Sequence, residues 1–353
     1  MQKKPPSKEL NESSGAKLIK SLKSWRTSSK SFLKFLYNHE TREVIGRDGL
    51  SWTKVSLCYL TFYVMLGSFF IGMLAVFAAT LSDKIPRYYM NKSIMASGKD
   101  EVNSLFRINP GLGFRPQLDP ESPLIFYSMS QHNKSKVLKE SLDIFLSTYY
   151  NIKYEQNTTY GVDCSNMSLT DARKLARNGF HCKYDYEKEL MNTYCSPLNN
   201  YGYSNSAEHD QEYGPCVALK LNKIYEWLPV AFKNESELPL AIRNDLKENE
   251  LIQNHVFIKC DGEYSSDRDA FGKMNLVYYS PGSKLFSVGM LPFYYYPYLN
   301  QYGYESPLVF VHFKNLPRHQ LINIICRAYA ANIDSDDKLN LRGMTEFQIF
   351  VEN

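Results

Sequence analysis

The chain has 353 residues and a net charge of +4, which is distributed unevenly. Residues 1–54 hold twelve Lys and Arg residues against five acidic residues, a balance of +7, so the remaining residues together carry −3. Because the basic residues gather only in this first segment, nothing in the charge pattern indicates a nucleic-acid-binding domain.

The first 36 residues are rich in Lys and Ser and poor in aliphatic residues. Such a composition cannot bury enough apolar surface to order itself, which predicts a solvated, disordered tail. Leu18, Leu22 and Trp25 recur at helical spacing beside Lys residues. A basic amphipathic helix lying on an anionic membrane surface is therefore the alternative for this segment.

Val55–Ser82 is a run of 28 residues without a charge, bounded by Lys54 and Asp83. A helix needs about 20 apolar residues to cross the hydrocarbon core of a bilayer, so this run predicts a transmembrane helix. A cleaved signal peptide would have a shorter apolar core near the start of the chain. We therefore expect the run to be retained as a signal-anchor.

The flanks of this span predict its orientation. The excess of Lys and Arg before the span places residues 1–54 in the cytosol, because positive loops stay on the cytoplasmic side. Residues 83–353 then form a large domain outside the cell, with the carboxyl terminus extracellular. This is type II topology.

The span has two different faces when its residues are placed at helical spacing. One face carries large side chains, and the other carries small ones that allow another helix to approach closely. The aromatic stripe, as we call the first face, consists of Tyr59, Phe62, Tyr63, Leu66, Phe70 and Met73. The small-residue face consists of Ser68, Gly72, Ala75 and Ala79. We expect a helical partner at the stripe, and either face is able to contact protein or lipid.

The outer segment has the features of a secreted domain. It contains six cysteines without CxxC or neighbouring His residues, which predicts three disulfides rather than a metal site. These are Cys164, Cys182, Cys195, Cys216, Cys260 and Cys326, whereas Cys58 near the inner end of the span is expected to be a free thiol. Five sequons predict N-glycosylation at Asn91, Asn133, Asn157, Asn166 and Asn234.

The secondary-structure pattern of the outer segment is mainly β in its second half. Helices are predicted at 134–150, with Val137, Leu138, Leu142, Phe145 and Leu146 on one face, and at 168–177, opened by Ser168 and Asp171. The stretch 192–213 predicts a long surface loop. Short β-branched and aromatic runs predict strands at 216–224, 255–260, 274–280, 306–313, 321–330 and 344–352. The expected fold is a single-pass membrane protein with one transmembrane helix and an immunoglobulin-like sandwich of antiparallel strands with a few short helices.

The sequence gives little indication of chemistry. It has no GxSxG, HExxH, P-loop or Gly-rich dinucleotide pattern, so we expect no catalytic, metal-binding or cofactor-binding residues. Two DxD triplets, Asp267 to Asp269 and Asp334 to Asp336, match the metal-binding triplet of type II Golgi glycosyltransferases. Turn-forming, hydrophilic residues surround both triplets, which favours solvated loops. A lumenal glycosyltransferase therefore stays as the alternative function.

Several motifs resemble the β subunit of the sodium/potassium-transporting ATPase over nearly the whole chain. They are Phe35-Leu-Tyr-Asn38, Gly46-Arg-Asp-Gly-Leu-Ser-Trp52, Tyr59-x-x-Phe62-Tyr63, Asn109-Pro-Gly-Leu-Gly-Phe-Arg-Pro116, Gly214-Pro-Cys-Val-Ala-Leu-Lys-Leu-Asn-Lys-Ile224 and Cys326-Arg-Ala-Tyr-Ala-Ala-Asn-Ile333. Two places depart from the family pattern. Pro292-Phe-Tyr-Tyr-Tyr-Pro297 stands where members commonly read Pro-Tyr-Tyr-Gly-Lys, and Val64 and Ser68 replace steps of the usual glycine ladder.

The resemblance implies a non-catalytic glycoprotein subunit at the plasma membrane. Its implied partners are the catalytic α subunit of the pump, membrane lipid and a small single-span regulatory subunit. The implied role is to let the α subunit fold and reach the cell surface and to modulate its handling of potassium. The β subunit of the related proton/potassium pump gives the same role. The resemblance also implies disulfides Cys164–Cys182, Cys195–Cys216 and Cys260–Cys326.

Overall fold

The computed structural model describes residues 35–39, 41–90, 93, 109–128, 132–155, 160–203, 214–246, 254–272, 275–282, 287–335 and 341–352. The basic tail before residue 35, with both interpretations of it, lies outside these residues. The chain divides into two compact units, Met1–Leu81 and Ser82–Asn353. Each unit is described separately below.

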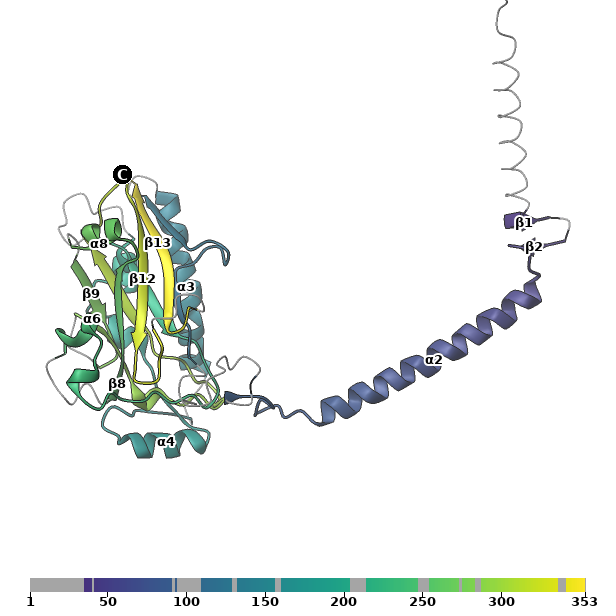
Figure 1. Ribbon diagram of the computed structural model, residues 1–353, viewed down its shortest axis with the longest axis horizontal. Coiled ribbons are helices and arrows are strands. Elements are labelled where there is room, and N and C mark those ends of the chain that lie inside the picture. The colour runs from purple at the N-terminus through teal and green to yellow at the C-terminus, as the bar shows by residue number, and fades with distance from the viewer. Residues whose placement is uncertain are drawn as a thin grey trace, which may run out of the picture. The chain divides into compact units, whose positions relative to one another are not determined.

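The described part of the first unit contains a short hairpin and one long helix (Figure 1). The hairpin pairs β1 (Tyr37–Asn38) with β2 (Glu43–Val44), and the helix is α2 (Gly49–Ala79). The predicted span began at residue 55, but α2 begins six residues earlier because Asp48 caps its first turn, accepting a hydrogen bond of 3.1 Å from the amide of Ser51. The helix also ends at Ala79 rather than at residue 82.

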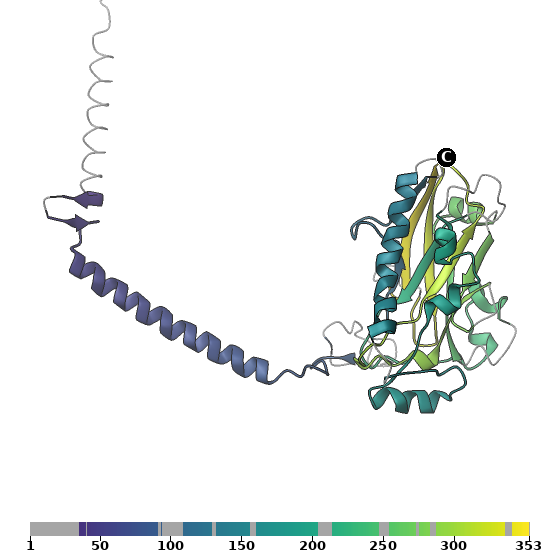
Figure 2. The same ribbon diagram turned by 180° about the vertical axis from the view of Figure 1, so that it is seen from behind.

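The second unit is a sandwich of two β-sheets, as Figures 1 and 2 show from opposite sides. The five-stranded sheet has the order β10 (Gly289–Pro292), β8 (His255–Gly262), β12 (Leu321–Tyr329), β13 (Met344–Glu352) and β4 (Leu124–Ser128). The four-stranded sheet has the order β3 (Leu112–Arg115), β7 (Cys216–Leu221), β11 (Val309–Lys314) and β9 (Asn275–Tyr279). All six predicted strands are present, and the sequence analysis missed β3, β4 and β10.

The strands of both sheets pair in antiparallel fashion, except that β13 and β4 are parallel. The expectation of a wholly antiparallel sandwich was therefore wrong at this edge. A parallel pair needs a long crossover, and more than two hundred residues separate β4 from β13 in the sequence. Only the three-dimensional fold brings these two strands together.

The core between the sheets is aromatic at its centre. Phe347 of β13 lies with its ring 4.8 Å from that of Phe114 in β3 and 6.1 Å from that of Phe313 in β11. A hydrogen bond also crosses between the sheets, because the amide of Cys260 in β8 donates to the hydroxyl of Tyr278 in β9 at 2.9 Å. These contacts join the sheets into one domain.

A long helix, α3 (His132–Glu155), closes one side of the sandwich by packing on the edge strands β3 and β4. It is longer than the predicted helix 134–150 and is not one of the few short helices expected. Its buried face follows Leu138, Leu142, Leu146 and Tyr149. Val137 was predicted on this face but is 47% exposed, because one residue turns an α-helix by about 100°.

Short elements fill the remaining connections. They are β5 (Gly161–Val162), α4 (Leu169–Arg177), β6 (His181–Cys182), α5 (Tyr186–Leu190), η3 (Pro197–Gly202), η4 (Glu235–Glu237), α6 (Leu240–Arg243), α8 (Ser265–Phe271) and η5 (Phe293–Tyr295). The helix at α4 and its cap by Ser168 are as predicted, since the hydroxyl of Ser168 accepts from the amide of Asp171 at 3.2 Å. The part of 192–213 that the structure describes is not a surface loop throughout, because Tyr201 and Tyr203 are buried.

Candidate functional site

The aromatic stripe of α2 lies on the surface of the first unit. Tyr59, Phe62, Tyr63, Leu66 and Phe70 are each at least half exposed. The rings of Tyr59 and Tyr63 stack with centres 6.3 Å apart, and that of Phe62 meets Tyr63 edge-on at 5.4 Å. Tyr59 lies one turn before Phe62 and Tyr63, so the three rings form a continuous aromatic surface that a neighbouring helix is able to pack against.

The small-residue face of the helix has one polar side chain, that of Ser68. The hydroxyl of Ser68 donates to the carbonyl oxygen of Val64 at 2.8 Å, so its polar group is satisfied within the helix. A Cβ atom added to Gly72 would have no neighbour within 4 Å outside its own helix. This face is therefore open to close approach by another helix or by lipid chains.

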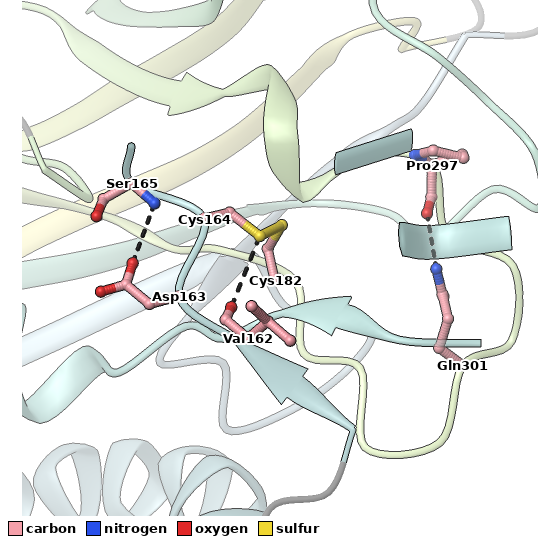
Figure 3. Close-up of a disulfide and its surroundings, with 7 residues drawn as sticks. All are labelled: Val162, Asp163, Cys164, Ser165, Cys182, Pro297 and Gln301. Atoms are coloured by element: carbon pink, nitrogen blue, oxygen red, sulfur yellow. Dashed lines mark hydrogen bonds between the residues drawn. A yellow bond between two sulfur atoms is a disulfide. The ribbon is translucent and has the colours of Figure 1, made fainter. Parts of the chain in front are cut away.

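The six outer cysteines are joined in sequence order, which is the pairing that the family resemblance implies. The bridges are Cys164–Cys182, Cys195–Cys216 and Cys260–Cys326. Cys58 is a free, exposed thiol on α2. The first bridge closes the loop that carries α4, and Figure 3 shows it beside the segment holding Pro297 and Gln301.

Two of the five sequon asparagines have described side chains, and both are exposed. Asn166 follows Cys164 in a turn, and Asn234 caps η4. Asn133 lies in the first turn of α3, where its side chain is not described, and Asn91 and Asn157 lie outside the described residues. Glycosylation at all five stays a prediction.

The first DxD triplet does not form the solvated loop expected for it. Asp267 and Asp269 lie in α8, and Asp267 is only 3% exposed. Its carboxylate accepts hydrogen bonds from the amide of Tyr264 at 3.3 Å and the side chain of Asn323 at 3.2 Å, so it caps the helix and ties it to β12. Asp334 is described, whereas Asp336 is not. Within the described ranges, no three His, Cys, Asp or Glu side chains come together as a metal site.

The Pro292–Pro297 segment, where the chain departs from the family pattern, is mostly folded inward. Tyr295 packs edge-on against Tyr184 with ring centres 6.0 Å apart, and Tyr296 meets Trp227 at 5.5 Å. Burial raises the pKa of Tyr295 and Tyr296, so both hydroxyls stay neutral. Of the four aromatic residues in the segment, only Tyr294 is partly exposed.

A cavity of about 920 Å³ lies in the second unit and is lined in part by α4. Figure 1 shows α4 at one end of the sandwich. The walls of the cavity come from the first residues of the unit, the carboxyl-terminal half of α4, residues 225–228 and the loop 297–302. Hydrogen bonds fix this loop, since the side chain of Gln301 donates to the carbonyl oxygen of Pro297 at 3.1 Å (Figure 3). The sequence analysis did not find this cavity. Two cations one helical turn apart, Arg173 and Arg177, could have indicated a positively charged site on this helix.

These features define a class of protein. The described residues contain one helix long and apolar enough to cross a membrane, α2. It is joined to a disulfide-bonded β-sandwich. The chain is thus a single-span membrane protein with a mainly-β domain on one side.

Comparison with known proteins identifies the family. The family described as the sodium/potassium ATPase beta chain matches residues 22–347. The chain is 33% identical to sodium/potassium-transporting ATPase subunit beta-2 of Drosophila melanogaster, covering 93% of this chain and 94% of that protein. It is 30% identical to the probable subunit beta-3 of Caenorhabditis briggsae, covering 93% of this chain and 89% of that protein. The chain belongs to the sodium/potassium ATPase beta chain family.

Family membership decides between the two functions considered from the sequence. The chain is a non-catalytic accessory subunit of a P-type cation pump, and it associates with the catalytic α subunit. The glycosyltransferase alternative was wrong, because the family match extends over most of the chain and Asp267 of the first DxD triplet is a buried helix cap.

Proposed function

We propose that this chain stabilises the catalytic α subunit by packing the aromatic stripe of α2 against its membrane helices. The observation that carries this proposal is the two-faced helix in a chain matched to the family over residues 22–347. Binding only to the folded partner shifts the folding equilibrium of that partner by mass action. The chain therefore promotes folding of the α subunit and its release to the plasma membrane. In the assembled pump it also modulates the handling of potassium.

We further propose that the amino terminus is cytosolic and the β-sandwich extracellular. The excess of basic residues in 1–54 supports this orientation through the positive-inside rule. Disulfides and exposed sequon asparagines in the second unit fit the oxidising, glycosylating side of the membrane. The small-residue face of Ser68 and Gly72 is left for lipid or for a small single-span regulatory subunit.

Co-expression tests the proposed role directly. An α subunit is expressed with and without this chain, and ouabain-sensitive ATPase activity is measured at the cell surface. We expect surface activity to rise with the chain because the complex escapes quality control. Equal surface activity in the two cases would contradict the proposal. Glycosidase treatment of intact cells, which shifts the mass of the chain only if its sandwich is extracellular, tests the orientation.

Truncating the aromatic stripe tests the proposed contact. In the triple variant Tyr59→Ala, Phe62→Ala and Tyr63→Ala, we expect co-purification with the α subunit in mild detergent to fall by roughly tenfold or more, since three large contacts are lost. Membrane insertion should be retained because the span stays apolar. The matched control is Ser68→Ala with Gly72→Ala on the opposite face. A loss of binding only in this control would move the contact to the small-residue face.

A further inference from the structure

The cavity beside α4 has charges of both signs, arranged with an excess of positive charge. Lys84, Arg173 and Arg177 line it together with a single acidic residue, Glu226. The Nε atom of Arg173 is buried without a hydrogen-bond partner, and none of the ion pairs between described residues involves these three cations. A buried guanidinium nitrogen left unpaired is costly, so the positive part of the cavity is suited to an oxyanion.

The rest of the wall is aromatic. The rings of Tyr160 and Tyr302 meet edge-on with centres 6.1 Å apart, and Tyr302 is 66% exposed. Tyr225 and Glu226 belong to the same cavity. Aromatic faces next to a carboxylate attract quaternary and primary ammonium groups through cation–π and Coulomb interactions. The cavity thus offers complementary groups for an anion and for an ammonium cation.

The segment that follows α2 in the chain also forms part of the cavity wall, through Lys84 and Ile85. Lys84 is five residues after Ala79, the last residue of α2, and an extended chain advances at most about 3.5 Å per residue. The covalent chain therefore keeps Lys84 within about 18 Å of the helix end, whatever the arrangement of the two units. The segment is tied to the cavity wall, because the side chain of Asn300 donates to the carbonyl oxygen of Lys84 at 3.4 Å and Tyr89 packs on Tyr225 at 5.1 Å.

We propose that this cavity binds the headgroup of a zwitterionic phospholipid. Arg173 and Arg177 bind the phosphate, while Tyr160, Tyr302 and Glu226 surround the ammonium group. The volume of about 920 Å³ is within the range of cavities that hold small molecules. The proposal requires that α2 spans a bilayer, but it does not depend on binding to a pump.

The test uses the full chain in lipid-free maltoside micelles and radiolabelled phosphocholine as the probe. Equilibrium dialysis should show saturable binding at one site per chain. Arg173→Gln and Arg177→Gln should each weaken it about tenfold, because each removes a charge-assisted hydrogen bond. Lys174→Gln is the matched control, since Lys174 lies on the same helix with the same charge but is not among the residues that line the cavity, and it pairs with Asp171 at 3.4 Å. It should leave binding unchanged.

Competition identifies the source of the ligand. Dihexanoylphosphatidylcholine should displace the probe at lower concentration than unlabelled phosphocholine, and inorganic phosphate or choline alone should be at least about tenfold weaker than phosphocholine. Three results would overturn the proposal: no saturable binding, equal weakening by Lys174→Gln, or displacement by inorganic phosphate as effective as by phosphocholine. Loss of probe binding on addition of the α subunit would also overturn it, by assigning the cavity to that protein.

Discussion

Replacing Phe347 by alanine is expected to lower the free energy of unfolding of the second unit by about 3–5 kcal/mol. The side chain is 1% exposed and contacts Phe114 and Phe313 of the facing sheet. Removing the ring loses its burial and leaves a cavity between two sheets that cannot close around it. Denaturant unfolding of the full chain in detergent, followed by near-ultraviolet circular dichroism, measures the change.

Phe350→Ala is the matched control for this prediction. Phe350 lies on the same strand, three residues further on, but points outward, is only partly buried and stacks on Phe126 of the neighbouring strand at 5.7 Å. We expect its loss to cost about 1 kcal/mol, since it removes one cross-strand pair and no core. Equal destabilisation by the two substitutions would show that the space between the sheets is not the main core.

Removing the bridge Cys260–Cys326 by a double alanine substitution is expected to cost about 4 kcal/mol. This bridge joins residues that face each other on β8 and β12 and are separated by 66 residues in the sequence. In the chain-entropy model, a longer closed loop restricts the unfolded chain more strongly. The loss should also reduce the amount of chain that leaves the endoplasmic reticulum, because misfolded domains are retained.

The double alanine variant of Cys195 and Cys216 provides the comparison. Its loop has a sequence separation of 21, so the same model gives a loss of about 3 kcal/mol. Both variants are unfolded in denaturant under oxidising conditions, so that the other bridges remain. If removing the bridge that closes the shorter loop lowers the free energy of unfolding more, loop entropy does not determine the contribution of these bridges.

The sequence by itself determined the features that depend on neighbouring residues. The apolar run at 55–82 was enough to find α2, because length and lack of charge are local properties. Ser168 and Asp171 located α4, where the hydrogen bond from Ser168 and the nearby Lys174 hold the pKa of the Asp171 carboxyl below its usual value. Six strands of the sandwich were found from their β-branched and aromatic composition.

The other three strands of the sandwich, β3, β4 and β10, were not found, since their local signals are weak. β10 contains Gly289 and Pro292, two residues that usually interrupt a strand. β4 is held by its parallel pairing with β13, a partner that no local pattern indicates. The two sheets and the side of the sandwich that α3 closes were therefore decided by contacts between distant segments.

The tertiary structure alone also decided which polar residues have a structural role and which line a site. Asp267 looked like a loop residue because its neighbours are hydrophilic, but α8 packs on β12 and buries it against Asn323. The cavity beside α4 shows the same limit, because it joins Lys84, Arg173 and Tyr302, which are far apart in the sequence. The local composition of a segment indicates its polarity and its backbone preference. Whether a side chain is buried, and which other residues it meets at a site, depends on the distant segments that pack against it.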